Sequence, residues 1–105
     1  MIRKLLFLVL FTVFFSCKTE MKVKSSDAEI ACGQCQFEMK DPKGCDLAIR
    51  VLDKPYFVDG YGIDDFGDAH DEHTGFCEVI RKAEIVGKVE EDRFKAESIT
   101  LIDQK

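Results

Sequence analysis

The apolar positions of this chain form one continuous block near the start and several shorter patterned runs after it. The block runs from Leu5 to Phe15, contains only one polar side chain, Thr12, and follows the basic pair Arg3 and Lys4. A helix over this block spans about 16 Å at ~1.5 Å per residue, which is roughly half of the hydrocarbon thickness of a bilayer. A basic start followed by a short apolar core is typical of a secretory signal peptide. We therefore expect an exported protein.

The residues after the block refine this prediction. Small Ser16 precedes Cys17, and the chain turns hydrophilic at Lys18. This pattern resembles a bacterial lipoprotein signal, which implies lipidation of Cys17. The expected organisation is a signal peptide over 1–16, a lipidated cysteine with a flexible tether over 17–28, and a small cysteine-stapled domain over 29–105. Such a protein is anchored to a membrane of the cell envelope, at the periplasmic or the outer-membrane face.

Alternating apolar and polar positions predict two strand pairs in the expected domain. Leu47 to Leu52 alternates between two faces, and Pro55 to Val58 follows after a short turn, so these runs predict a hairpin. The runs 85–89 and 94–102 predict a second hairpin around the acidic turn 90–93. The alternation slips within the last run, and we expect a bulge near 97–99.

One helix is predicted between these two hairpins. Phe76, Val79, Ile80 and Ala83 recur at the spacing of an amphipathic helix, and Thr74 precedes them as a candidate N-cap. The order of elements indicates a β-rich α+β fold. We expect a small antiparallel sheet or a partly closed OB-like barrel with one short helix.

Composition limits the classes of function. The chain has 20 acidic and 15 basic residues, a formal charge of -5, and no basic patch with interleaved aromatic residues, so nucleic-acid binding is not expected. A domain this small rarely builds a sufficient core, and natural examples add disulfides or a metal. The chain has five cysteines, and four remain for that role if Cys17 is lipidated.

The spacing of two of these cysteines favours a metal site. In Cys32-Gly33-Gln34-Cys35, a two-residue gap lets both sulfurs reach one tetrahedral ion. Cys77 supplies a third thiolate, and the acidic stretch supplies imidazole nitrogen ligands. We expect one zinc or copper ion, and the predicted ligands are Cys32, Cys35, His70 and Cys77, with Cys45 and His73 in reserve.

Two alternatives use the same sulfurs. In an oxidising compartment Cys32, Cys35, Cys45 and Cys77 can form two disulfides in any of three connectivities. The pair Cys32 and Cys35 also resembles a thioredoxin-type site, but the preceding βαβ unit of that fold is missing here. A disulfide-stapled interaction domain is therefore the second hypothesis, and a thiol-disulfide redox protein is the third.

An acidic stretch lies between the hairpins and contains no Lys or Arg from 59 to 77. Such a loop is a candidate docking surface for a cationic protein partner. No nucleophile or phosphate-binding loop accompanies it, so an enzyme is the less favoured reading. Its carboxylates are Asp59, Asp64, Asp65, Asp68, Asp71 and Glu72.

The runs ACGQCQFEMK, GCDLAIR, KPYFVDG, GDAH, GFC and IRKAEIVGKV resemble a family of small cysteine-containing bacterial lipoproteins. That family is of the Bacteroidota type and is known only as a domain of unknown function, so the resemblance implies no activity. Its recurring positions map onto Cys32, Cys35, Cys45, Asp59, His70 and Cys77. A more distant resemblance links the chain to copper-delivering accessory lipoproteins, which place a cysteine and a methionine early, here Cys35 and Met39.

Overall fold

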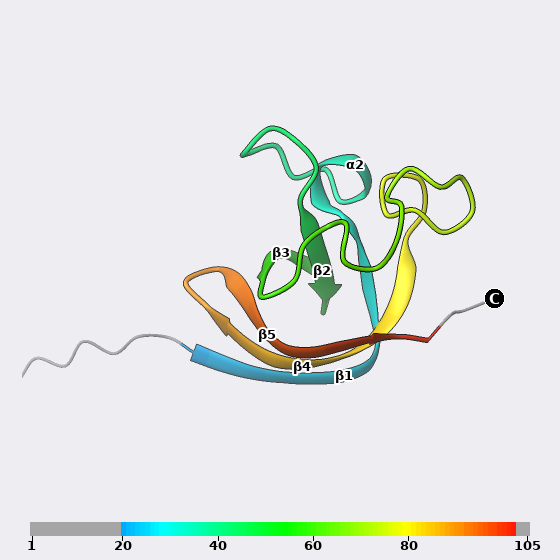
Figure 1. Cartoon of the computed structure of the whole chain (residues 1–105). Coiled ribbons are helices and arrows are strands. Elements are labelled where there is room, and N and C mark those ends of the chain that lie inside the picture. Colours follow the sequence, from blue (N-terminus) through cyan, green and yellow to red (C-terminus); the bar gives the residue numbers. More distant parts are fainter. Residues whose placement is uncertain (1–19, 103–105) are drawn as a thin grey trace, which may run out of the picture.

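The computed structural model describes residues 20–102, which form a closed barrel of five strands (Figure 1). The order around the barrel is β1-β2-β3-β5-β4. All neighbouring strands are antiparallel except β3 and β5, which run parallel. The strands are β1 (Glu20–Cys32), β2 (Leu47–Val51), β3 (Lys54–Asp59), β4 (Arg81–Glu90) and β5 (Arg93–Leu101), and the short helix is α2 (Gly33–Gln36). The expected β-rich barrel with one short helix is confirmed.

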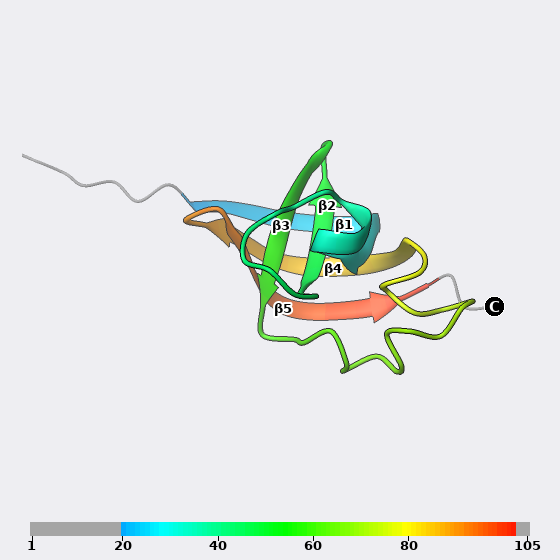
Figure 2. The ribbon, with the colours of Figure 1, turned by 90° about the horizontal axis from the view of Figure 1, so that it is seen from above.

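The long strand β1 closes the barrel because it pairs on both sides. Its first part lies along β4, and its last residues, from Glu29 to Cys32, pair with β2. The pairing with β4 continues to Ile30 and is interrupted by a register shift between Ser25 and Ala28, and bulges of this kind bend a strand. Seen from above, β2 and β3 cross over β1, β4 and β5, which lie side by side (Figure 2).

The core fills the space that this crossing encloses. In β4 every second side chain from Arg81 to Val89 is buried, the period of a half-buried strand. Phe94 from β5 is fully buried, and Gly87 opposite gives it room, because a Cβ there would lie 2.8 Å from the Phe94 ring. The largest fully buried side chains are Phe94, Ile30, Ile49, Ile85 and Cys32, so a cysteine belongs to the core itself.

Both predicted hairpins are confirmed. The register of β4 and β5 shifts between Val86 and Gly87, whose partners are Ser98 and Ala96. Glu97 is the extra residue, so the bulge falls at one end of the expected 97–99 region.

The predicted helix over 76–83 is wrong. Gly75, Glu78 and Val79 make a single turn, in which both later N–H groups donate to the Gly75 carbonyl oxygen at 2.9 Å. The chain is already in β4 at Arg81. The apolar spacing covered only two turns of a helix, while Ala83 continues the alternation of β4, and pairing with β1 and β5 decides the outcome. Within residues 20–102 the one helix is instead α2, which contains Cys35.

The expected flexible tether over 17–28 is also corrected, because β1 begins at Glu20. Residues from Glu20 to Ser25 are paired with β4 although most of their side chains are exposed or half-buried. Their polar composition is that of an exposed strand held by main-chain hydrogen bonds. The signal peptide and Cys17 lie outside the described residues. Within 20–102 no helix is long and apolar enough to cross a membrane.

Candidate metal centre

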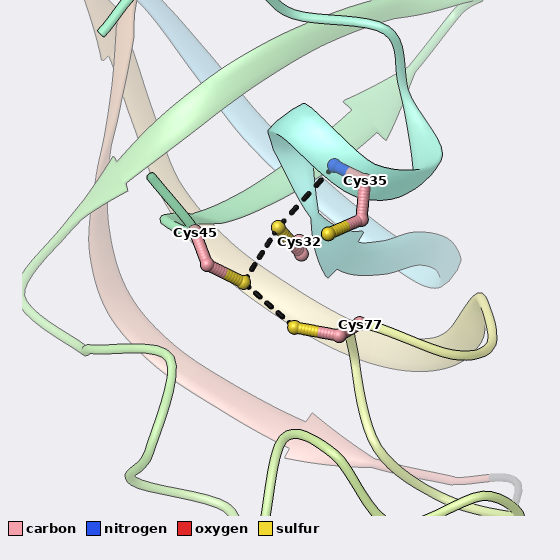
Figure 3. A group of neighbouring side chains, drawn as sticks. All are labelled: Cys32, Cys35, Cys45 and Cys77. Carbon is pink, nitrogen blue, oxygen red and sulfur yellow. Dashed lines mark hydrogen bonds between the residues drawn. The ribbon is translucent and has the colours of Figure 1, made fainter. Parts of the chain in front are cut away.

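Four cysteine sulfurs from separate parts of the chain meet at one end of the barrel (Figure 3). Cys32 is the last residue of β1, Cys35 lies in α2, and Cys45 and Cys77 lie in the loops that lead to β2 and β4. Their Sγ atoms are all within 4.8 Å of one another, and the four cysteines are free thiols. The group can therefore hold a metal ion.

The distances indicate a convergent cluster and not two separate pairs. Cys45 Sγ lies 2.7 Å from Cys32 Sγ and also 2.7 Å from Cys77 Sγ. A disulfide requires about 2.05 Å and only one partner for each sulfur. Four thiolates around zinc, with Zn–S near 2.3 Å, stand about 3.8 Å apart. Two of the observed separations are shorter than that value and all are within 4.8 Å, so modest displacements of the side chains produce a tetrahedral set.

The turn from Cys32 to Cys35 is formed by the start of α2. Cys32 is the N-cap of α2, and its Sγ accepts a hydrogen bond from the Cys35 N–H at 3.3 Å. This turn presents both sulfurs on the same side. Gly33 is buried between them, and a Cβ there would lie 2.6 Å from Met39 Sδ and 2.8 Å from the Phe57 ring. Glycine is therefore required by packing.

Two glutamines of α2 hold the neighbouring loops. Gln34 Nε2 donates to the Pro42 carbonyl oxygen at 2.7 Å and to Asp46 Oδ2 at 2.9 Å, while its Oε1 accepts from the Asp46 N–H at 2.8 Å. Gln36 Nε2 donates to the Cys77 carbonyl oxygen at 2.9 Å. Each glutamine therefore fixes the main chain at, or next to, another cysteine of the cluster. This role of the glutamines was not predicted, although both side chains lie within or beside the Cys-Gly-Gln-Cys motif.

The acidic stretch from 59 to 77 positions Cys77 through its own turns. Asp71 Oδ1 accepts from the N–H groups of His73 and Thr74 at 2.8 and 2.9 Å, and the Cys77 N–H donates to the Ala69 carbonyl oxygen at 2.9 Å. Gly75 is packed against this turn, since a Cβ there would lie 2.2 Å from the Ala69 oxygen. Part of the acidic charge in this stretch thus serves to fold the loop.

The thiols perturb one another's pKa values. Burial acts to raise the pKa of Cys32, but hydrogen bonds from Cys45 and Cys35 outweigh it and hold that pKa below its usual value. The hydrogen bond to Cys32 raises the pKa of Cys35 to about 12, and burial raises the pKa of Cys45. The cluster thus favours one thiolate surrounded by thiols, because further negative charges repel each other. A bound cation removes that repulsion.

The structure brings together three of the four predicted ligands, namely Cys32, Cys35 and Cys77. His70 is not in the group, and the fourth member is Cys45, which the sequence analysis held in reserve. His70 and His73 are both exposed. The physical reason is that their loop folds on Asp68 and Asp71, which accept main-chain N–H groups at 2.9 and 2.8 Å, and between residues 68 and 74 the buried side chain is Ala69.

The other predicted carboxylates are distributed along the same loop. Asp59 pairs with Arg93 at 2.8 Å and Lys95 at 3.2 Å, and these pairs lower its pKa, Arg93 most strongly. Asp65 accepts the Gly62 N–H at 2.7 Å. Asp64 and Glu72 are exposed. No cationic partner surface follows from these positions alone, because several of the carboxylates already have structural partners.

Fold and site together define a class, that of small closed β-barrels with a four-cysteine cluster at one end. Within that class, the chain belongs to a family of unknown function, DUF6370, whose family model matches residues 26–102. The match confirms the expected membership in an uncharacterised domain family. No curated protein and no solved structure matches the chain.

Proposed function

We propose that this protein is an exported, membrane-anchored module that binds one thiophilic metal ion, Zn²⁺ or Cu⁺, through Cys32, Cys35, Cys45 and Cys77. The observation that supports this most strongly is the position of Cys45, whose sulfur lies 2.7 Å from two other cysteine sulfurs at once. In two disulfides each sulfur has a single partner, so they do not explain why one sulfur lies close to two others. A shared ion gathers several sulfurs around one point. Thiolates are the ligands that both ions prefer.

The size of the domain adds a second argument. A barrel this small buries a limited apolar core, and the cluster connects the end of β1 to loops that carry no regular structure of their own. A bound ion links these segments, and because the unfolded chain offers no preformed site, its binding energy stabilises the folded state.

Elemental analysis tests the proposal directly. The full chain, purified without added reductant or chelator, is expected to carry about one equivalent of zinc or copper. The double variant with Cys45→Ser and Cys77→Ser is the matched control and is expected to carry none. Absence of metal together with absence of free thiols in the unchanged protein overturns the proposal in favour of two disulfides.

The anchoring part of the proposal rests on the apolar block before Cys17 and on the start of β1. Only Lys18 and Thr19 lie between Cys17 and Glu20, and the step from 17 to 20 spans at most about 11 Å. A lipidated Cys17 therefore holds the barrel close to the lipid headgroups. Cys17→Ala is expected to move the protein from the membrane pellet to the soluble fraction, and an unchanged pellet overturns lipid attachment at this residue.

A further inference from the structure

The four cysteines of the cluster differ in their access to solvent. Cys32 is fully buried in the barrel core, and Cys45 and Cys77 are half-buried. Cys35 is exposed. In Figure 3 its side chain comes from α2 and reaches the other three sulfurs from that side. An ion at the centre of the cluster would therefore have three sheltered ligands and one that incoming molecules can reach.

The contacts that join the loops of the cluster do not use the Cys35 side chain. The Cys32 N–H donates to the Phe76 carbonyl oxygen at 3.0 Å. This bond fixes the end of β1 against the residue that precedes Cys77. The carbonyl oxygen of Cys77 accepts from Gln36, and the loop that carries Cys45 is held by Gln34 through Asp46. The Cys35 side chain projects from a helix of four residues. Because solvent lies on one side of it, its thiol can turn away by χ1 rotation without displacing these contacts.

We propose that Cys35 is the exchange ligand of the site, through which the ion is passed to or received from a thiolate-bearing partner. This inference rests on the proposed metal-binding function and adds that the ion is transferable cargo. The alternative is a permanent structural ion that all four cysteines hold equally.

The transfer step is a ligand substitution without a change of oxidation state. The partner's thiol loses its proton, and its thiolate forms a new bond to the ion. The bond between the ion and Cys35 Sγ then breaks, and the Cys35 thiolate takes up one proton. Cys32, Cys45 and Cys77 hold the ion during this first substitution. Further ligands of the partner then replace them in the same way, and each released thiolate takes up one proton, so no free ion is released. A thiolate is the expected incoming group because soft ions prefer sulfur to carboxylate or imidazole ligands.

Alkylation of the zinc-loaded full chain tests whether Cys35 is the most reactive of the four cysteines. With iodoacetamide as the probe and peptide mass mapping as the readout, Cys35 is expected to react at least about tenfold faster than the other three cysteines. Zinc release, followed with a chromophoric chelator, is expected to keep pace with the modification of Cys35. Modification of Cys32, Cys45 or Cys77 first, or of all four together, overturns the inference.

Transfer kinetics provide the second measurement. Zinc transfer from the unchanged protein to dithiothreitol is expected to be first order in the dithiol, because the incoming thiolate attacks the bound ion. A parallel experiment with Cu⁺ shows whether the same route serves both ions. A rate that does not depend on the dithiol concentration means that the ion leaves before the acceptor arrives, and this overturns the inference.

Variants separate failure of this inference from failure of the metal site. Cys35→Ser is expected to keep one equivalent of zinc and to lose it to dithiothreitol at least about tenfold faster, since water takes the open position. Cys77→Ser, which changes a half-buried cysteine, is expected to bind well below one equivalent of zinc. If the unchanged protein binds no ion, the proposed function is wrong. If it binds one ion and Cys35→Ser binds none, only the exchange role is wrong.

Discussion

The main-chain N–H of Cys32 donates a hydrogen bond of 3.0 Å to the carbonyl oxygen of Phe76, the residue directly before Cys77. This bond joins the last residue of β1 to a loop far along the chain, and each side of it carries one sulfur of the cluster. A second bond, from the Gly33 N–H to the Asp46 carbonyl oxygen at 2.8 Å, does the same for Cys45. These two bonds therefore hold the end of β1 beside the loops that carry Cys45 and Cys77, where the cluster forms.

The identity of the fourth ligand gives the first prediction. Cys45→Ser is expected to reduce bound zinc well below one equivalent, because Cys45 Sγ is central to the sulfur contacts. His70→Ala is expected to leave one equivalent in place, because His70 is exposed and outside the group. The readout is elemental analysis of both variants after gel filtration. Loss of zinc from the histidine variant with retention in the cysteine variant contradicts the four-cysteine site.

Removal of the ion is expected to destabilise the barrel. A ligand that binds only the folded state at a thousand times its Kd adds about 4 kcal/mol, which for a domain of this size corresponds to a fall in Tm of about 15–30 °C on chelation. Thermal unfolding followed by circular dichroism, with and without a chelator, measures the shift. The double variant with Cys45→Ser and Cys77→Ser controls for effects of the chelator itself. If the chelator does not change the Tm of the protein without substitutions, no stabilising ion was bound.

The hairpins of this fold are predictable from the sequence because their signals are local. The alternation around Ile49 and Ile85 fixes which face is buried, and the short turns between the strands fix the pairing. The start of β1 is different. Four of the six residues from Glu20 to Ser25 are polar, and all six are exposed or half-buried. They become a strand only because β4 provides partners 60 to 70 residues further on.

The cluster was predictable in composition but not in its final member. The number of cysteines and the Cys32–Cys35 spacing indicate that the sulfurs meet, but they leave metal binding, disulfides and redox chemistry open. Whether Cys45 or His70 completes it depends on contacts across loops, chiefly those of Gln34 with Asp46 and of Gly33 with the Asp46 carbonyl oxygen. Such side-chain-to-main-chain contacts have no periodic signature in a sequence.

Gly33 is expected to be sensitive to the smallest substitution. In Gly33→Ala the added Cβ would lie 2.6 Å from Met39 Sδ and 2.8 Å from the Phe57 ring, so neighbours must move, and we expect a loss of about 1–3 kcal/mol. Gly62→Ala is the matched control, because its Cβ meets only Asp65 Oδ2 at 3.8 Å. Urea unfolding of the zinc-loaded proteins measures both. Equal stability of the two variants contradicts the tight packing at Gly33.

Asp71 is expected to support Cys77 from a distance. Its carboxylate accepts two main-chain N–H groups, from His73 and Thr74, and these bonds lower its pKa. Asp71→Ala removes both bonds and, by analogy with loss of a helix cap, is expected to weaken zinc binding severalfold. Asp71→Asn keeps an acceptor oxygen and is expected to restore most of the affinity. Competition titration with a chelator gives the Kd values, and the exposed Asp64→Ala serves as the neutral control. Equal affinities for Asp71→Ala and Asp64→Ala mean that the turn does not position Cys77.

Asp59 is expected to make barrel stability depend on pH below neutrality. It lies on β3 opposite Lys95 of the parallel strand β5, and its pairs with Arg93 and Lys95 lower its pKa in the folded state. A carboxyl whose pKa is lower when folded stabilises the protein fully above its unfolded pKa of about 3.9, and this stabilisation is lost as the pH falls through the folded value. The group is about one-third exposed, so solvent screening limits the contribution to about 1 kcal/mol or less.

Asp59→Asn is therefore expected to be less stable than the unchanged protein at pH 7, and this difference in the free energy of unfolding narrows below about pH 4. Urea unfolding of both proteins, down to the lowest pH at which both remain folded, measures the gap, and loss of the ion in acid affects both alike. A gap that stays constant or widens as the pH falls shows that the charge of Asp59 does not stabilise the β3–β5 pair.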